Sequence, residues 1–133
     1  MVQVRIVGVA VDSSAQHLIL LKPTDEPSGT GRMLPIWIGA QEATSILIAM
    51  EGAEAPRPLS HDLMKTLIEA VGATVERVEV TKLEDGTFYA EISLRTRNGS
   101  LVLDSRPSDA IGIASRVDAP IWVNDEVMDQ AGI

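Results

Sequence analysis

Residues Leu101–Arg116 read LVLDSRPSDAIGIASR and join an apolar strand to an apolar helix through a short polar segment. Pro107 suits the first helical position, because its fixed φ matches a helix and its missing N–H is not needed there. Asp109 then falls in the first turn, where its carboxylate can accept unpaired backbone N–H groups and face the positive end of the helix dipole. The residues that follow are apolar on nearly every side, so we expect this helix to be buried. Gly112 lowers its helix propensity, which indicates close packing against another element.

The polar segment has two interpretations. In one, Asp104 and Asp109 are oxygen ligands for Mg²⁺ or a general acid and base, and Arg106 holds a phosphate or carboxylate. In the other, Asp109 caps the helix and Arg106 is its ion-pair partner, or Arg106 pairs with Asp104. The residues alone leave both interpretations open.

Composition limits the class of protein. The chain has 133 residues, 45% hydrophobic and 23% charged, which predicts one domain over residues 1–133. It has no cysteine, which excludes disulfides, thiolate metal sites and a cysteine nucleophile. Its net charge is −8, whereas proteins that bind nucleic acid usually carry clustered basic residues. A local basic patch or bridging metal ions would still allow nucleic acid as a partner. No signal peptide or run of 18 apolar residues is present, so we expect no membrane contact and a cytoplasmic location.

The hydrophobic pattern predicts an α+β fold with a mostly antiparallel sheet built from hairpins and packed with three to four short helices. Strands are expected at 2–11, 17–21, 33–38, 74–83, 87–96, 100–103 and 119–123, and helices at 41–50, 60–71, 107–117 and after Asn124. Pro35 indicates an edge strand or a bulge. The loop-like stretch Lys22–Arg32 is expected to be mobile.

The helix at 60–71 carries two further expectations. Ser60 can cap its N-terminus. Its apolar residues Leu63, Leu67, Ile68 and Val71 are expected to face the core.

Two other groups could carry chemistry. His61 and Asp62 follow Arg57 at the start of that helix, and could act as a base or metal ligand with Arg57 on a phosphate; alternatively, Asp62 complements the helix dipole and His61 lies at the surface. Glu42 could join the acids as a metal ligand or serve the dipole of its own helix. The sequence contains no serine–histidine–acid pattern and no zinc-ligand spacing.

The chain resembles the bifunctional nuclease domain family. The similarity rests on LPIWIG at 34–39 with Glu42-Ala43, on RPLSHDL at 57–63, on FYA at 88–90 and above all on DSRPSDA at 104–110. These blocks cover nearly the whole chain in family order. The resemblance implies a nuclease acting on DNA, RNA or both.

On this basis we expect a metal-dependent phosphodiesterase. Asp104, Asp109 and His61 are the expected catalytic residues, and Arg57, Arg106 and Ser108 the expected substrate-binding residues. Mg²⁺ or Mn²⁺ would be held by Asp104 and Asp109 with Glu42 or Asp62. The alternative is a non-catalytic regulatory or protein-interaction module in which DSRPSD is a structural clasp. A homodimer is expected in either case, because open sheets leave edges that must be covered.

Overall fold

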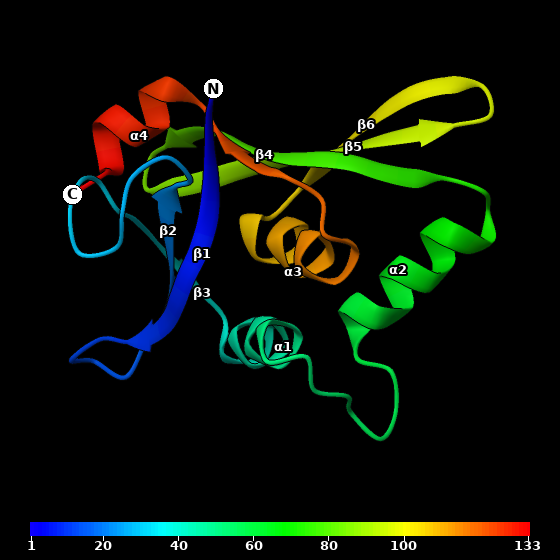
Figure 1. The fold of residues 1–133 in the computed structure, drawn as a ribbon, viewed down its shortest axis with the longest axis horizontal. Coiled ribbons are helices and arrows are strands. Elements are labelled where there is room, and N and C mark those ends of the chain that lie inside the picture. The colour runs from blue at the N-terminus through cyan, green and yellow to red at the C-terminus, as the bar shows by residue number, and fades with distance from the viewer.

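Seven strands rich in β-branched and apolar residues form one sheet in the computed structural model, which describes residues Met1–Ile133 (Figure 1). The strands are β1 (Val2–Val11), β2 (His17–Pro23), β3 (Leu34–Ile38), β4 (Thr74–Glu84), β5 (Thr87–Thr96), β6 (Gly99–Ser105) and β7 (Ile121–Val123). The helices are α1 (Ala40–Met50), α2 (Ser60–Ala70), α3 (Pro107–Val117) and α4 (Asp125–Ala131). The predicted α+β class and its hairpins are confirmed.

The sheet has the order β3-β2-β1-β7-β4-β5-β6. Every neighbouring pair is antiparallel except β4 and β7, which are parallel. The three residues of β7 join the two halves of the sheet, pairing with Val2–Val4 on one side and Val78–Val80 on the other. Pro35 lies in the edge strand β3, as predicted, because an edge strand tolerates a missing N–H. The other edge is β6.

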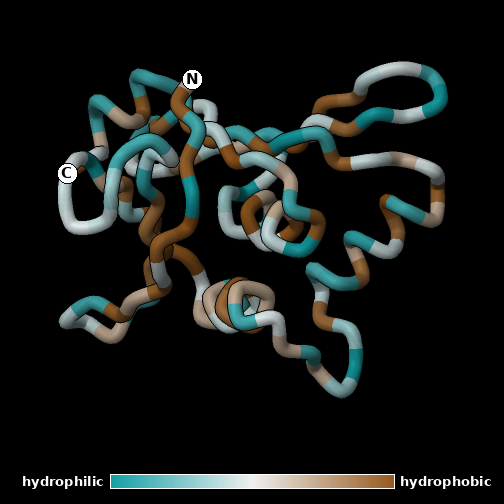
Figure 2. Tube along the Cα trace, in the orientation of Figure 1, coloured by the Kyte–Doolittle hydropathy of each residue, from teal (hydrophilic) through white to brown (hydrophobic).

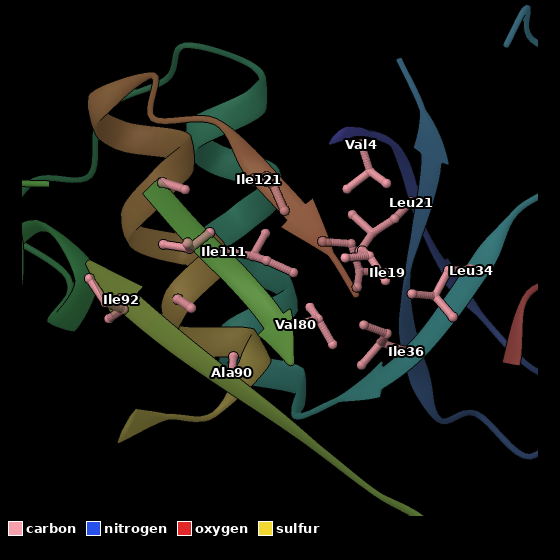
Figure 3. Packing of buried hydrophobic residues seen from close by; sticks show 14 of the residues in the cluster. Val4, Ile19, Leu21, Leu34, Ile36, Val80, Ala90, Ile92, Ile111 and Ile121 are labelled. Carbon is pink, nitrogen blue, oxygen red and sulfur yellow. The ribbon is translucent and has the colours of Figure 1, made fainter. Parts of the chain in front are cut away.

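The helix that follows the polar segment is the centre of the core. Seven of the eleven residues of α3 are buried, which confirms the prediction for this helix. It packs against β4 and β5 and contacts both α1 and α2 (Figure 1). Its Ile111 is fully buried and belongs to one cluster with Val80 of β4 and Ile19 and Ile36 of the other half of the sheet (Figure 3). Both halves of the sheet therefore share a single core.

The predicted cap of α2 and most of its predicted inward face are wrong, although Ile68 packs against the core as predicted. Leu63, Leu67 and Val71 are 52%, 57% and 75% exposed. The helix instead turns a stripe with the spacing i, i+3, i+7 inward, in which His61 is buried and Met64 and Ile68 pack against the core. Ser60 is the first helical residue rather than the cap; Leu59 is the N-cap, and its N–H donates to the Asp62 carboxylate at 2.8 Å.

The segment between β2 and β3 is held by two cations. Lys22 is buried, and its ammonium group donates to the carbonyl oxygens of Thr30 and Arg32. Arg5 donates to the carbonyl oxygens of Pro23 at 2.9 Å and Glu26 at 3.1 Å. These contacts close the loop against β1 and β2. None of the four helices is long and apolar enough to span a membrane.

Candidate functional site

Three helices bring polar side chains to one cavity. Glu42 and Ser45 come from α1, His61 from α2, and Arg106 and Asp109 from the start of α3. The cavity has a volume of about 660 Å³, and its remaining lining residues are Ala40, Gln41, Thr44, Leu59, Ser60 and Met64. Because α3 is buried, the polar residues at its N-terminus are held in fixed positions at the wall of this cavity.

His61 links all three helices. Its side chain is only 3% exposed. Nδ1 lies 2.7 Å from Ser45 Oγ, and Nε2 lies 2.9 Å from Asp109 Oδ1. The ring sits against Gly112 of α3 so closely that a β-carbon at that position would overlap it. The close packing predicted from Gly112 is thus confirmed, and its partner is the histidine ring.

The hydrogen-bond network assigns the protons on His61. A carboxylate only accepts, so Nε2 carries a proton and donates it to Asp109. In a neutral ring protonated on Nε2, Nδ1 is an acceptor, so the Ser45 hydroxyl donates to Nδ1 while its oxygen accepts from Arg116 Nη2 at 2.9 Å. His61 therefore presents a directed donor to Asp109.

Arg106 and Asp109 form an ion pair at the mouth of the cavity. Arg106 Nε and Nη2 lie 3.0 Å and 2.9 Å from Asp109 Oδ2, and Nη1 lies 3.7 Å from Glu42 Oε1. The Arg106 side chain is 66% exposed, so its guanidinium group is open to a ligand. The hydrogen bond from Arg106 to Asp109 and the charge of that carboxylate raise the arginine pKa.

Asp109 is held as an anion. Its partial burial favours the protonated form, but the hydrogen bonds from His61 and Arg106 outweigh that effect and keep its pKa below the ordinary value. The ion pair with Arg106 confirms one part of the structural interpretation of this segment. The capping role is wrong, because Arg106 is the N-cap of α3 and no side chain caps it.

A second group of polar contacts surrounds Arg116. Arg116, at the end of α3, has a side chain only 6% exposed and donates from Nε to Asp62 Oδ1 at 2.7 Å. It also donates to the Ser45 carbonyl oxygen at 3.1 Å and to the Gly112 carbonyl oxygen at 3.1 Å. The hydrogen bonds to Asp62 from Arg116 and from the Leu59 backbone lower the pKa of that carboxyl. The cluster ties α1, α2 and α3 together at their inner faces.

The structure brings together four of the residues expected at the site, namely Glu42, His61, Arg106 and Asp109. Asp104 is exposed on β6 and lines an adjoining groove together with Arg106 and Asp109. The remaining three lie elsewhere: Ser108 is buried in the wall of a neighbouring cavity, Asp62 turns toward Arg116, and Arg57 is exposed without a side-chain hydrogen bond.

Sequence reasoning missed Ser45 and Arg116. Ser45 lies between Ala43 and Ile46, which form the buried stripe of α1, and Arg116 follows the apolar run of α3. Both residues are polar and lie on or next to a predicted buried face. This position is a signal for an internal hydrogen-bond partner, because a buried polar group needs one.

The acidic residues do not form a complete metal site by themselves. No three His, Asp or Glu side chains are placed so that they could hold a metal ion together. Asp109 and Asp62 are occupied by arginines, whereas Glu42 and Asp104 make no hydrogen bond. Glu42 lies 3.7 Å from Arg106 Nη1 and lines the cavity, whereas Asp104 lines the adjoining groove, so these two carboxylates do not share one site.

Comparisons with known proteins agree with the sequence motifs. A family model described as the bifunctional nuclease domain matches residues 19–133. An uncharacterized protein of Mycobacterium tuberculosis strain H37Rv is 43% identical over 131 residues, covering 98% of this chain and 76% of the mycobacterial one. Bifunctional nuclease 1 of Oryza sativa subsp. japonica is 31% identical over 92% of this chain and 37% of its own length. Bifunctional nuclease 1 of Arabidopsis thaliana is 34% identical over 88% of this chain and 36% of its own length.

Proposed function

Because the chain belongs to the bifunctional nuclease domain family, we propose that it hydrolyses phosphodiester bonds of DNA or RNA in the cavity between α1, α2 and α3. One observation carries the proposal. An exposed arginine and a carboxylate fixed by a buried histidine stand side by side at the wall of that cavity. A guanidinium group is suited to bind phosphate oxygens, and a carboxylate can accept a proton from water.

In the proposed reaction, Arg106 binds the scissile phosphate. Asp109 holds Nε and Nη2 and so fixes the plane of the guanidinium group, whereas Nη1 makes no hydrogen bond. Nη1 is therefore the nitrogen that donates first to a phosphate oxygen. With Glu42 and Asp109 beside it, the cavity has a net negative charge, and a divalent cation on Glu42 would offset this charge as the phosphate enters.

Asp109 accepts the proton of the attacking water. Once a phosphate shares the charge of Arg106, the influence that lowers the Asp109 pKa weakens and the carboxylate becomes a better base. The water oxygen forms a bond to phosphorus, the ester P–O bond breaks, and the leaving oxygen takes a proton from solvent. His61 is a positioning residue, because it holds Oδ1 while Oδ2 faces Arg106, the residue that binds the phosphate.

The proposal is tested by comparing two matched arginine variants. Arg106→Gln removes the phosphate ligand, and we expect it to lower the cleavage rate of labelled single-stranded DNA and RNA by about 100-fold. Arg95→Gln is the control, because Arg95 is 71% exposed and also lies 2.9 Å from a carboxylate, that of Glu76 on the hairpin formed by β4 and β5. It should cleave at the wild-type rate. Equal rates for wild type and Arg106→Gln would contradict the proposal.

One observation favours the second function, a non-catalytic module with the segment 104–109 as a clasp. Within the protein, Asp109 pairs with Arg106 and His61, and no buried polar side-chain atom lacks a hydrogen-bond partner. In that case neither the wild-type protein nor any variant cleaves nucleic acid, and Asp109→Asn lowers stability only. The same cleavage assay, combined with thermal unfolding of each variant, separates the two functions.

A further inference from the structure

A second cavity adjoins the candidate site and shares Arg106 with it. Its volume is about 600 Å³, and it lies between the end of β3, the start of α3 and the turns that join β1 to β2 and β4 to β5. Figure 2 shows that β3 is apolar where it approaches α1. Although the chain has a net charge of −8, no aspartate, glutamate or lysine lines this cavity. It therefore suits an uncharged group attached to an anion at Arg106.

Ser108 offers an unused hydrogen-bonding group in this cavity. The residue is 5% exposed and lines the cavity, and its hydroxyl makes no hydrogen bond within the protein. Every fully enclosed polar side-chain atom of the protein has a partner, so this hydroxyl is not enclosed but opens into the cavity. Buried polar groups normally find a partner, and a hydroxyl left free in a cavity wall indicates a ligand with a polar edge.

Aromatic side chains add a second feature of the cavity. Trp37 of β3 and Phe88 of β5 are both lining residues. Trp37 is 52% exposed, yet its orientation is fixed, because the indole Nε1 donates to Asp12 Oδ2 at 2.9 Å. An exposed indole ring that is held in one orientation presents a ready surface for a flat, aromatic ligand.

We propose that the second cavity binds the base of the nucleotide next to the scissile phosphate, an inference that rests on the proposed function through the phosphate bound at Arg106. The base stacks on Trp37, and its polar edge meets the Ser108 hydroxyl. His17, which also lines the cavity and makes no side-chain hydrogen bond, is a second group for that edge. A nucleotide joins a flat, uncharged base to an anionic phosphate, which is the combination that this cavity and Arg106 together accept.

The proposal makes the substrate single-stranded. A base within a duplex is stacked and paired, so it enters a protein cavity only after it has been unstacked, at a cost in free energy. A base in a single strand is free to turn into the cavity. The Ser108 hydroxyl both donates and accepts, so it suits carbonyl and amino groups alike and does not select one base.

Base binding is tested by isothermal titration calorimetry with chelator present, using two tetranucleotides with the same phosphates. One carries four thymines, and the other is abasic at every position. The wild-type protein is expected to bind the thymidine tetranucleotide about 10-fold more tightly than the abasic one. Trp37→Leu and Ser108→Ala should weaken binding of the first and leave binding of the second unchanged. Ser100→Ala is the control, because Ser100 is exposed on β6 and also makes no side-chain hydrogen bond; it should bind as the wild type does.

Circular dichroism shows that each variant is folded. Equal affinity of the wild type for both tetranucleotides, binding of neither, or an unchanged preference in both Trp37→Leu and Ser108→Ala would overturn the base site. Calorimetry does not depend on cleavage, so a protein that prefers the thymidine tetranucleotide but cuts no strand contradicts the proposed function alone.

Strand preference is tested by the cleavage rate of one labelled oligonucleotide, free and annealed to its complement. We expect the wild type to cleave the duplex at least about 10-fold more slowly. Equal rates on the single strand and the duplex would show that the protein is a nuclease and overturn the base site.

Discussion

At the scale of single residues, the site depends on a histidine ring that is tightly packed and hydrogen-bonded on both nitrogens. His61 has a hydrogen-bond partner on each nitrogen and the backbone of Gly112 against its face. A ring packed in this way is pre-organised, because its orientation is set before any ligand arrives. The glycine belongs to the site as much as the polar residues do.

Gly112→Ala is predicted to displace His61. The added methyl group overlaps the imidazole, so we expect a loss of about 1–3 kcal/mol in the free energy of unfolding, measured by urea denaturation. Gly8→Ala is the control, because a β-carbon at Gly8 meets no atom within 4 Å. If Gly112→Ala is as stable as the wild type, the packing described for His61 is incorrect.

Two carboxylates predict how stability changes with pH. The pKa values of Asp109 and Asp62 lie below their ordinary value in the folded chain. The stabilisation that this lowering contributes is complete well above about pH 4, and is lost as the pH falls through the lower folded values, because the unfolded chain takes up protons first. Urea denaturation at a series of pH values between 7 and 2.5 should show this loss.

The double variant Asp62→Asn with Asp109→Asn identifies the carboxylates responsible. It should be less stable at pH 7 and lose less stability on acidification than the wild type does. Asp129→Asn serves as the control, since Asp129 is exposed in α4 and makes no hydrogen bond, and its pH profile should match the wild type. If the stability of the double variant falls with decreasing pH as steeply as that of the wild type, these two carboxylates are not the source of the pH dependence.

Residue identities predicted part of this site. The pattern around Asp109 correctly placed it in the first turn of a buried helix beside Arg106, because Pro107 and the apolar run define that helix. The histidine partner could not be predicted, because His61 lies 48 residues away and the contact depends on how α2 packs on α3. Long-range side-chain pairs of this kind are set by tertiary packing rather than by local pattern.

At the scale of elements, Arg116 joins three helices. Its guanidinium group contacts a carboxylate on α2, a carbonyl oxygen on α1 and a carbonyl oxygen on α3. We predict that Arg116→Gln lowers the free energy of unfolding by about 2–4 kcal/mol, because it leaves a buried carbonyl group without a partner and breaks an ion pair. Chemical denaturation measures the change.

The surface ion pair of Arg95 gives the reference for that prediction. Arg95→Gln should cost less than about 1 kcal/mol, because exposed ion pairs contribute little. Similar losses for the two variants would mean that Arg116 does not tie the helices together.

The elements show what pattern can and cannot predict. The strands expected at 87–96 and 100–103 match β5 and β6, because the signals there, strand alternation and the hairpin dipeptide Asn98-Gly99 between the two strands, are local. The predicted orientation of α2 about its axis is wrong. The helix has one apolar stripe that contains Leu63 and Leu67 and another that contains Met64 beside His61, and the second stripe packs inward. The parallel pairing of β7 with β4 was not predicted, since three residues carry no signal for their partner.

At the scale of the whole molecule, net charge opposes the proposed substrate. A chain with a charge of −8 repels nucleic acid at long range, and phosphate binding at Arg106 must overcome this repulsion locally. Divalent cations bound at carboxylates such as Glu42 would offset this repulsion. Cleavage is therefore expected to require Mg²⁺ or Mn²⁺ and to stop when a chelator is added.

The most direct measurement is cleavage of labelled single-stranded DNA and RNA by highly purified wild-type protein and by Asp109→Asn, each with Mg²⁺, with Mn²⁺ and with chelator. We predict cleavage by the wild type that needs the cation and is reduced at least 100-fold in Asp109→Asn, with circular dichroism showing that the variant is folded. Equal cleavage by both proteins, or no cleavage by the wild type under any of these conditions, would contradict the assignment of a nuclease site to Arg106, Asp109 and His61.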